Sequence, residues 1–598
     1  MCGIIGYIDA NAVINSTDFE LMRDTMHHRG PDGFGAEYFK NKQVALGHRR
    51  LSIIDLSEHS AQPMSNTEKT IWISFNGEIY NFIELREELS NKYTFTSSGD
   101  TEVLVYGYQE WGIDKLVKKL NGMFAFSIWD SVKNKLWIVR DRIGIKPLYY
   151  YKKDTTLIFA SELKAITSYP SFQKKISNEG LSSYFLYRYV IAPFTIYEDC
   201  YKLEPGHYAS YDLNTASFQK TQYWKLTDNI KEDNSSEQDK IKVIKELLND
   251  AVKKRALAAD VPVQTFLSGG IDSSFITALL NKHTKDLQAF SIEVVDDYKN
   301  EIKDAELVAD KLQVPLKKEQ LNSKKFDSMH DKVIAAYDEP LGDTSNIPTY
   351  FLCQLTAKDA KVAMSGDGGD ELFYGYNWYL KFNDCVEDKD LLNEYIKTCL
   401  NTFDKSQIKS LFKNNDKIEA VQQCFQNKIG DKINKSTVHM LDFHTFMVDD
   451  ILTKVDTASM CHSLEVRVPF LDHRMVEMAY SINYKEHFKN NELKYLLKKA
   501  AEEYLPNDTI YKQKKGFSVP SIRWITADFE HNIINGYASK DNVWEKNELK
   551  IKFKGKLHEE QKWLLYNFER WYAFNFHNNA PILKKSLFQK ISSRLKLN

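Results

Sequence analysis

The residues of this chain best suited to chemistry form a glycine-rich segment near its middle, Leu267–Ser274, which reads Leu-Ser-Gly-Gly-Ile-Asp-Ser-Ser. An apolar, β-rich run at 261–267 leads into it, and a helical pattern follows from Phe275. Such a turn between a strand and a helix N-terminus directs backbone N–H groups and the positive end of a helix dipole at one point, which suits an anion. We therefore expect a phosphate site here, with an ordinary glycine-rich turn as the alternative.

The composition of this turn also indicates which phosphate chemistry it would support. It lacks the Gly-Lys-Ser/Thr ending of a P-loop. A phosphate site without that lysine favours attack at the α-phosphorus of ATP, which yields AMP and pyrophosphate, over transfer of the γ-phosphoryl group. Ser268, Ser273 and Ser274 add hydroxyl donors, and Asp272 can hold a metal ion.

The second half of the chain alternates strand and helix patterns, which predicts a doubly wound parallel sheet. Ligands of such sheets bind at the carboxyl ends of strands, where a second acidic turn, Asp367–Glu371, also falls. Asp272 and Asp370 are therefore the natural pair for Mg²⁺ bound largely through phosphate oxygens and water. A plain acidic turn is the alternative for Asp367–Glu371. The predicted strands are 261–267, 287–294 and 361–366, and the predicted helices include 241–259 and 304–313.

A second chemical feature is Cys2, which directly follows Met1. A small residue at this position allows removal of Met1, so we expect the thiol to share its residue with a free α-amine. That amine titrates at about 7.7–8.0 and can serve as the base for the thiol. The alternative is a small buried residue that happens to be cysteine.

Three polar segments beside apolar runs accompany this cysteine: His48–Ile53, Asn76–Asn81 and Ser98–Glu102. An amide substrate needs a nucleophile, donors to its developing oxyanion, and groups that hold its charged ends. The three segments supply each of these types. Taken singly, their charged residues are more often surface or helix-capping side chains.

The composition of the 598 residues predicts at least two globular domains. The net charge of −2 gives no electrostatic case for nucleic-acid binding. The seven cysteines form no Cys-x-x-Cys pair, which argues against a disulfide framework or a zinc site and favours a cytoplasmic location. No apolar run approaches the roughly 18 residues that span a membrane, and the N-terminus lacks a signal-peptide pattern.

Leu267–Ser274 looks like the pyrophosphate loop of the N-type ATP pyrophosphatases. Together with the start Met1–Gly6, it resembles the glutamine-hydrolysing asparagine synthetases, over nearly the whole chain. The resemblance implies a class II glutaminase domain at 2–224, an αββα sandwich, and a polar linker at 225–239. The synthetase domain would follow at 240–598, with a doubly wound parallel sheet and helical C-terminal additions.

The resemblance also implies roles for residues of both domains. Cys2 would attack the side-chain amide of glutamine, and the Asn76 side chain and Gly77 N–H would form the oxyanion hole. The glutamine clamps would be Arg50 for the α-carboxylate and Glu78 and Asp100 for the α-ammonium. The ATP site would comprise Leu267, Ser268, Gly269, Gly270, Asp272, Ser273, Ile292, Ser365 and Gly366. Lys514 would face the phosphates, and Asp367 would be the base.

Two positions depart from the family pattern. Members that make asparagine often carry Glu where Asp367 stands, and Asp is one methylene shorter. They are also expected to carry an Arg, for the carboxylate of aspartate, where this chain has Thr344. A bidentate Arg is the usual partner of a carboxylate, so its absence leaves the acceptor open.

We therefore expect an ATP-dependent amidotransferase that uses glutamine, ATP, Mg²⁺ and a carboxylate acceptor, and that passes ammonia between its sites through a closed passage. Aspartate is the first choice of acceptor, and a uronic acid of a nucleotide sugar is the second. A regulatory relative that only binds glutamine or nucleotide, and another class II glutaminase enzyme, are the alternatives that the complete motif set argues against. The resemblance leaves a homodimer open.

The tail at 582–598 has the pattern of a basic amphipathic helix. We expect a helix docked on its domain, with contact to a membrane surface as the weaker alternative.

Overall fold

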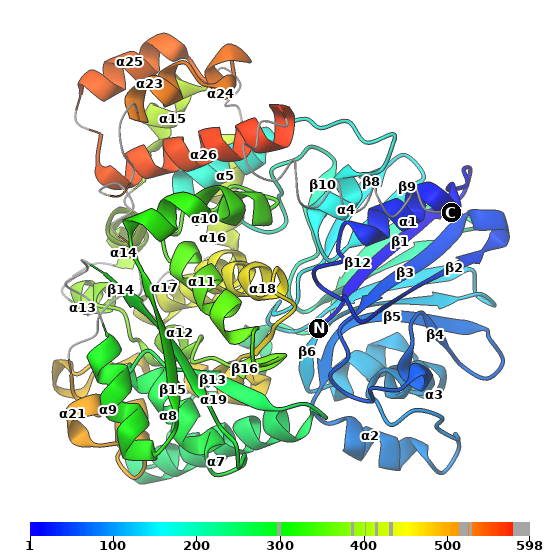
Figure 1. Ribbon diagram of the computed structural model, residues 1–598, viewed down its shortest axis with the longest axis horizontal. Coiled ribbons are helices and arrows are strands. Elements are labelled where there is room, and N and C mark those ends of the chain that lie inside the picture. The colour runs from blue at the N-terminus through cyan, green and yellow to red at the C-terminus, as the bar shows by residue number, and fades with distance from the viewer. Residues whose placement is uncertain are drawn as a thin grey trace.

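The computed structural model describes residues 1–295, 301–383, 388–400, 402–412, 417–429, 434–512, 519, 524, 529–555 and 557–577. Two antiparallel six-stranded sheets lie face to face in the N-terminal part, and a parallel five-stranded sheet forms the centre of the rest (Figure 1). No helix among these residues is both long enough and apolar enough to cross a membrane.

The N-terminal part is an αββα sandwich, as the sequence predicted. Helices α1 (Ser16–Asp24) and α4 (Leu163–Thr167) pack on the first sheet, and α3 (Thr101–Lys119) packs on the second. Apolar side chains such as Ile4 and Trp129 fill the space between the sheets. In spatial order, the first sheet contains β10 (Cys200–Lys202), β8 (Tyr149–Lys153), β9 (Thr156–Ala160), β1 (Gly3–Asp9), β3 (Val44–Arg50) and β2 (Gly33–Phe39). The second contains β12 (Ser217–Gln222), β11 (His207–Asp212), β7 (Lys135–Arg140), β6 (Gly122–Asp130), β5 (Ile71–Ile79) and β4 (Met64–Ser65).

The second part contains a parallel sheet with helices on both faces, which confirms the doubly wound prediction. The sheet runs β15 (Leu316–Leu321), β14 (Ala289–Val294), β13 (Val263–Phe266), β16 (Val362–Met364) and β17 (Glu465–Arg467). One face packs against α7 (Glu237–Leu257), α8 (Ile271–Leu280) and α20 (Tyr495–Ala501). The other packs against α10 (Ser323–Ala336), α11 (Asn346–Thr356) and α18 (Thr453–Met460).

The segments after β16 and β17 are mainly helical, as expected. An eleven-residue π-helix, η4 (Asp442–Leu452), runs directly into α18. Near the C-terminal end, α26 (Glu559–His577) packs against α10 and joins a small helical group at the edge of the molecule (Figure 1).

A buried cluster of charges joins the two parts around Arg29. Its guanidinium donates to Glu162 at 3.0 Å and to Asp456 of α18 at 2.8 and 3.3 Å. Lys146 Nζ lies 3.5 Å from the same Asp456. The Arg29 side chain is fully buried, and both acids are almost so. These charges hold the sandwich against α18, because Arg29 and Lys146 of the sandwich both contact Asp456 of the helix.

We predict that Arg29→Met destabilises the protein strongly. Removing one member of a buried charge cluster typically costs about 3–5 kcal/mol, because the remaining charges lose their partner. The melting temperature in differential scanning fluorimetry should fall by several degrees.

Lys92→Met is the matched control, since Lys92 is 63% exposed and pairs with Glu110 on the surface. Its effect should stay within about 1 kcal/mol. Equal melting temperatures for the two variants would contradict the structural role given to Arg29.

Candidate active sites

The glutaminase candidates gather where β1 begins, beside β5. The backbone N–H of Cys2 donates to Asn76 Oδ1 at 2.9 Å, and Cys2 Sγ lies 3.9 Å from the carbonyl oxygen of Leu51. Asn76 is completely buried, and its Nδ2 has no hydrogen-bond partner among the described residues. An unsatisfied amide N–H beside a thiol is available to an incoming oxyanion.

The thiol of Cys2 is not yet activated in this arrangement. Burial raises its pKa above the ordinary value and Glu78 adds to this, while the N-terminal ammonium, the Leu51 contact and Arg50 act to lower it. The Arg50 guanidinium is held by two backbone carbonyls, those of Ser57, at 2.8 Å, and Asp55.

The two predicted ammonium clamps are both buried acids. Burial raises the pKa of Asp100 to about 6, although the Ile79 N–H donates to this carboxyl at 2.8 Å. Burial and the nearby Glu465 raise the pKa of Glu78 as well, against the effect of Arg467. Two buried acids with elevated pKa values are suited to receive a positively charged group.

The synthetase part contributes to this site through β17, which the sequence reasoning did not foresee. Arg467 Nη2 lies 3.3 Å from Glu78, and the amine of Met1 lies 2.9 Å from Glu465, with both of these groups fully buried. Met1 itself is only 2% exposed. Loss of Met1 would therefore leave a space lined by Cys2 and these charges.

Arg29 is a second residue of this site that the sequence analysis did not single out. Its Nε donates to the carbonyl oxygen of Cys2 at 3.0 Å, in addition to its contacts with Glu162 and Asp456. The backbone of Cys2 is thus fixed by a side chain that also contacts the synthetase part.

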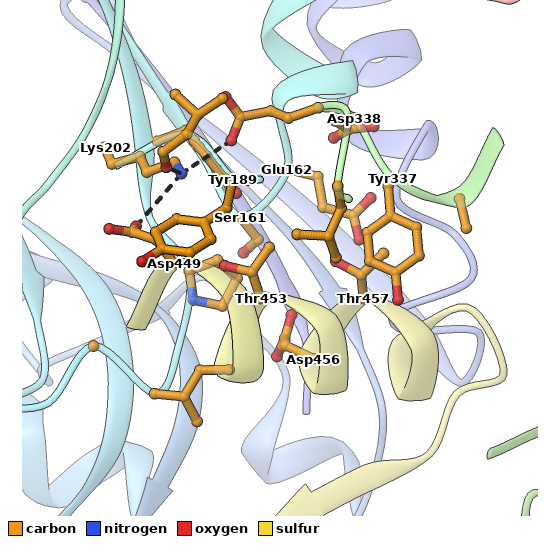
Figure 2. Close-up of a pocket in the computed structure, with 18 of the residues that line it drawn as sticks. Ser161, Glu162, Tyr189, Lys202, Tyr337, Asp338, Asp449, Thr453, Asp456 and Thr457 are labelled. Carbon is orange, nitrogen blue, oxygen red and sulfur yellow. Dashed lines mark hydrogen bonds and ion pairs between the residues drawn. The ribbon is translucent and has the colours of Figure 1, made fainter. Parts of the chain in front are cut away.

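Behind Arg29 lies a narrow cavity of about 30 Å³ between the two parts. Figure 2 shows Ser161, Glu162 and Lys202 on its sandwich side and Asp449, Thr453 and Asp456 on the η4–α18 side. Lys202 crosses it to contact Glu339 at 3.1 Å and Asp449 at 3.4 Å (Figure 2). The cavity has room for one or two molecules of the size of water or ammonia.

The phosphate candidates line a much larger cavity, of about 670 Å³, at the carboxyl ends of β13, β14 and β16. Eight of the nine predicted ATP residues line this cavity: Leu267, Ser268, Gly270, Asp272, Ser273, Ile292, Ser365 and Gly366. Gly269 does not line it. Gly269 has φ +77°, and a Cβ there would come within 2.5 Å of the backbone of Asp304 and Ala305, so it allows the turn to pack on α9 (Ile302–Leu312).

The residues of this cavity fit a divalent cation with its phosphate ligands. Lys494 Nζ contacts Asp272 at 2.5 Å and Asp370 at 2.7 Å, so both carboxylates converge on one positive charge. The described residues contain no cluster of three or more His, Cys, Asp or Glu side chains that could hold a metal ion. Two carboxylates with phosphate oxygens and water completing the shell is the usual arrangement for Mg²⁺.

Lys494 was not predicted from the sequence, where it is one lysine among many. Burial acts to lower its pKa, but Asp272 and Asp370 outweigh this and raise it, so the side chain is a cation. Gly375 makes room for it, since a Cβ there would lie 2.0 Å from Lys494 Cε.

Asp367, Lys514 and the C-terminal tail are the remaining predictions for the synthetase part. Asp367 lines the large cavity, accepts a hydrogen bond from Ser365 Oγ, and has its pKa raised by burial. Lys514 and the amphipathic tail at 582–598 lie outside the described residues.

The comparisons with known proteins agree with this division into two sites. The model of a glutamine amidotransferase domain matches residues 1–224, and the asparagine synthase model matches residues 243–573. Asparagine synthetase [glutamine-hydrolyzing] 1 of Bacillus subtilis is 33% identical over 96% of this chain and 97% of its own length. Asparagine synthetase [glutamine-hydrolyzing] 3 of the same organism is 32% identical over 86% and 87%. Amidase chry2 of Gibberella zeae is 26% identical over 91% and 92%.

The fold and the two sites define a two-domain, glutamine-dependent ligase that uses ATP to amidate a carboxylate. The chain belongs to the glutamine-hydrolysing asparagine synthetase family, which confirms the resemblance drawn from its motifs.

We predict that Gly366→Ala blocks the ATP-dependent half-reaction. A Cβ at this position would lie 2.7 Å from Ser273 N and 2.9 Å from the carbonyl carbon of Asp272, so the two phosphate-site turns would have to separate. A displacement of about 1 Å in a catalytic site can cost about 100-fold in rate. Pyrophosphate release should fall by this order, and glutamine hydrolysis should persist.

Gly555→Ala is the control, because the nearest atom to its added Cβ is 3.3 Å away and it lies at the end of α25 (Lys546–Lys554), outside both cavities. Normal pyrophosphate release by Gly366→Ala would mean that the close contact of the two turns is not needed for ATP chemistry.

Proposed function

We propose that the protein converts aspartate to asparagine through a β-aspartyl-AMP intermediate, with release of AMP and pyrophosphate. The observation that carries this proposal is the pairing of two candidate sites in one chain. Cys2 with Asn76 suits an amide substrate, and the cavity around Leu267–Ser274 suits ATP. The family assignment and the name of the Bacillus subtilis relatives support aspartate as the acceptor.

In the first half-reaction, the Cys2 thiolate attacks the side-chain amide of glutamine, and the free α-amine left by removal of Met1 takes the thiol proton. The Asn76 Nδ2 and the Gly77 N–H donate to the oxyanion. Arg50 holds the α-carboxylate of glutamine, and Glu78 and Asp100 receive its ammonium. The α-ammonium returns the proton to the departing nitrogen, so that collapse of the intermediate gives a thioester and ammonia, and water then hydrolyses the thioester and releases glutamate.

In the second half-reaction, the acceptor carboxylate attacks the α-phosphorus of ATP and displaces pyrophosphate. Asp272 and Asp370 would hold Mg²⁺, which neutralises phosphate charge. The N–H groups at the start of α8 and the hydroxyls of Ser268 and Ser273 bind phosphate oxygens, and the family resemblance assigns Lys514 to the same phosphates. Ammonia then attacks the acyl-adenylate, and Asp367 takes the proton that the new amide must lose.

The two half-reactions require a closed path for ammonia, because ammonia released into water is protonated and lost as a nucleophile. The cavity behind Arg29 supports this requirement, since residues of both domains line it and Arg29 contacts the backbone of Cys2. Helix α18 and the end of η4 separate it from the ATP cavity: Thr453 and Asp456 line the first, and Ile451, Lys454 and Val455 line the second.

We predict that the protein, offered ATP, Mg²⁺ and aspartate as the only acceptor, releases pyrophosphate and forms asparagine with either glutamine or ammonium as nitrogen donor. Cys2→Ala should lose the glutamine-dependent reaction and keep the ammonia-dependent one, because only the first site needs the thiol. Coupled pyrophosphate detection and amino-acid analysis measure both.

Loss of both reactions in a folded Cys2→Ala protein would contradict the division of labour between the sites. Absence of pyrophosphate release from wild-type protein with aspartate, while glutaminase activity is intact, would refute aspartate as acceptor and favour nucleotide-linked uronic acids.

A further inference from the structure

The lysines that line the ATP cavity within the described residues occupy two walls of different character. Lys494 contacts Asp272 and Asp370, Lys512 lies 3.1 Å from Asp304, and Lys498 bonds Glu492. All three lie on the side of α20 and the phosphate-binding turn. Lys454 approaches from α18, which packs on the opposite face of the sheet.

The ammonium of Lys454 is held in a defined place. Its Nζ donates to Asp343 Oδ2 at 2.9 Å and to Ser345 Oγ at 2.7 Å, and the side chain is only 8% exposed. Asp343 and Ser345 flank Thr344 in the chain, and Thr344 is the position where the family pattern led us to expect an arginine. An ammonium has three N–H donors, so one remains beyond these two bonds.

Both members of the Lys454–Asp343 pair are charged. Burial acts to lower the pKa of Lys454, but Asp343 and Asp450 outweigh it and raise this pKa. Burial acts to raise the pKa of Asp343, but Lys454 and Ser345 outweigh it and hold this pKa well below its usual range. The wall therefore presents one fixed positive and one fixed negative charge side by side.

The position of this pair relative to the reacting groups is also defined. Asp367, the proposed base, lines the same cavity as Lys454, which acts to lower the pKa of Asp367. Two residues along α18 from Lys454, Asp456 lines the cavity behind Arg29. A substrate held at Lys454 would lie between the ATP site and the entry point of ammonia.

We propose that Lys454 is the specificity-determining residue for the acceptor: it binds the carboxylate that does not react, and Asp343 binds the ammonium beside it. This assignment rests on the proposed function and deepens it, because it makes the acceptor a zwitterion. A uronic acid has no ammonium to offer Asp343, and its diphosphate would add negative charge to a wall that already carries Asp343 and Asp367.

The test uses three acceptors that differ by one charged group. Aspartate carries both groups, β-alanine lacks the non-reacting carboxylate, and succinate lacks the ammonium. The assay is pyrophosphate release by the full-length protein with ammonium as nitrogen donor. A site built to bond a charged group discriminates strongly against the analogue that lacks it.

We expect Lys454→Met to lower kcat/KM for aspartate by about 10–100-fold, the equivalent of one charged hydrogen bond, and mainly through KM. The kcat/KM for β-alanine and the KM for ATP should stay near wild type, so that the preference for aspartate over β-alanine collapses. Asp343→Asn should reduce the preference for aspartate over succinate instead. Lys454→Arg should restore most of the aspartate activity.

Lys317→Met is the matched control, since Lys317 is a half-exposed lysine of the same domain that pairs with Asp359 outside the cavity. Glutaminase activity reports whether each variant is folded, and if Lys454→Met fails to fold, Lys454→Gln and Ser345→Ala replace it with the same acceptor set.

The outcomes distinguish a failure of the proposed function from a failure of the Lys454 assignment. Wild-type protein that releases no pyrophosphate with aspartate would overturn the proposed function and this assignment with it. Wild-type protein that uses aspartate, with an unchanged aspartate to β-alanine preference in folded Lys454 variants, would overturn only the assignment of Lys454.

Discussion

The structure depends on one buried guanidinium, that of Arg29, more than on any other single group. It contacts the carbonyl oxygen of Cys2, the proposed nucleophile, the Glu162 carboxylate of the sandwich and the Asp456 carboxylate of α18. A guanidinium is suited to this because its planar set of donors can serve several acceptors at fixed angles. The site that produces ammonia is thereby tied directly to the helix that borders the site that consumes it.

A second connection runs through the short strand β17. Its Arg467 carbonyl accepts the N–H of Ser365, at the edge of the ATP cavity, while its guanidinium reaches Glu78 in the glutaminase site. Arg467 therefore contacts both sites, the ATP cavity through its backbone carbonyl and the glutaminase site through its side chain. Buried charges are costly to desolvate, and those of β17 find partners both within the strand, where Arg467 contacts Glu465, and across the interface, where Arg467 contacts Glu78.

Two buried lysines with different partners lie on opposite sides of the ATP cavity, at the edge of the parallel sheet. Lys494 lies between the two acids that suit Mg²⁺, on the side of the phosphate-binding turn. Lys454 lies on the other side, next to Asp343 and near Asp367. Gly366 leaves room for the backbone of Asp272, and Gly375 leaves room for Asp370 and Lys494, because a Cβ at either glycine would fill the space that these residues occupy.

Much of this organisation is visible in the sequence. The Leu267–Ser274 turn follows β13 and caps α8 as its strand–glycine–helix pattern predicts, and the Asp367–Glu371 turn follows β16. Strands β15 and β17 were not predicted, because the first is an edge strand rich in Lys and Glu and the second has only three residues with charged ends. Their apolar alternation is too weak to detect.

The roles of Arg29, Lys454 and Lys494 could not be predicted for a different reason. Each contacts partners more than 100 residues away, such as Asp456 for Arg29 and Asp272 for Lys494. No local pattern distinguishes such a residue from a solvated lysine or arginine.

The predicted linker at 225–239 contains the short helix α6 (Leu226–Asn229) and the first turn of α7, since Ser236 caps that helix through the N–H of Asp239.

The central claim is that ammonia formed at Cys2 reaches the acyl-adenylate without entering solution. It is tested most directly with glutamine labelled with ¹⁵N in its side-chain amide, in the presence of unlabelled ammonium that exceeds the ammonia released from glutamine but stays below the concentration at which Cys2→Ala forms product. The amide of the product is then analysed by mass spectrometry. The structure predicts nearly full ¹⁵N enrichment, whereas enrichment diluted to the ratio of the bulk ammonium pool would contradict a closed path between the two sites.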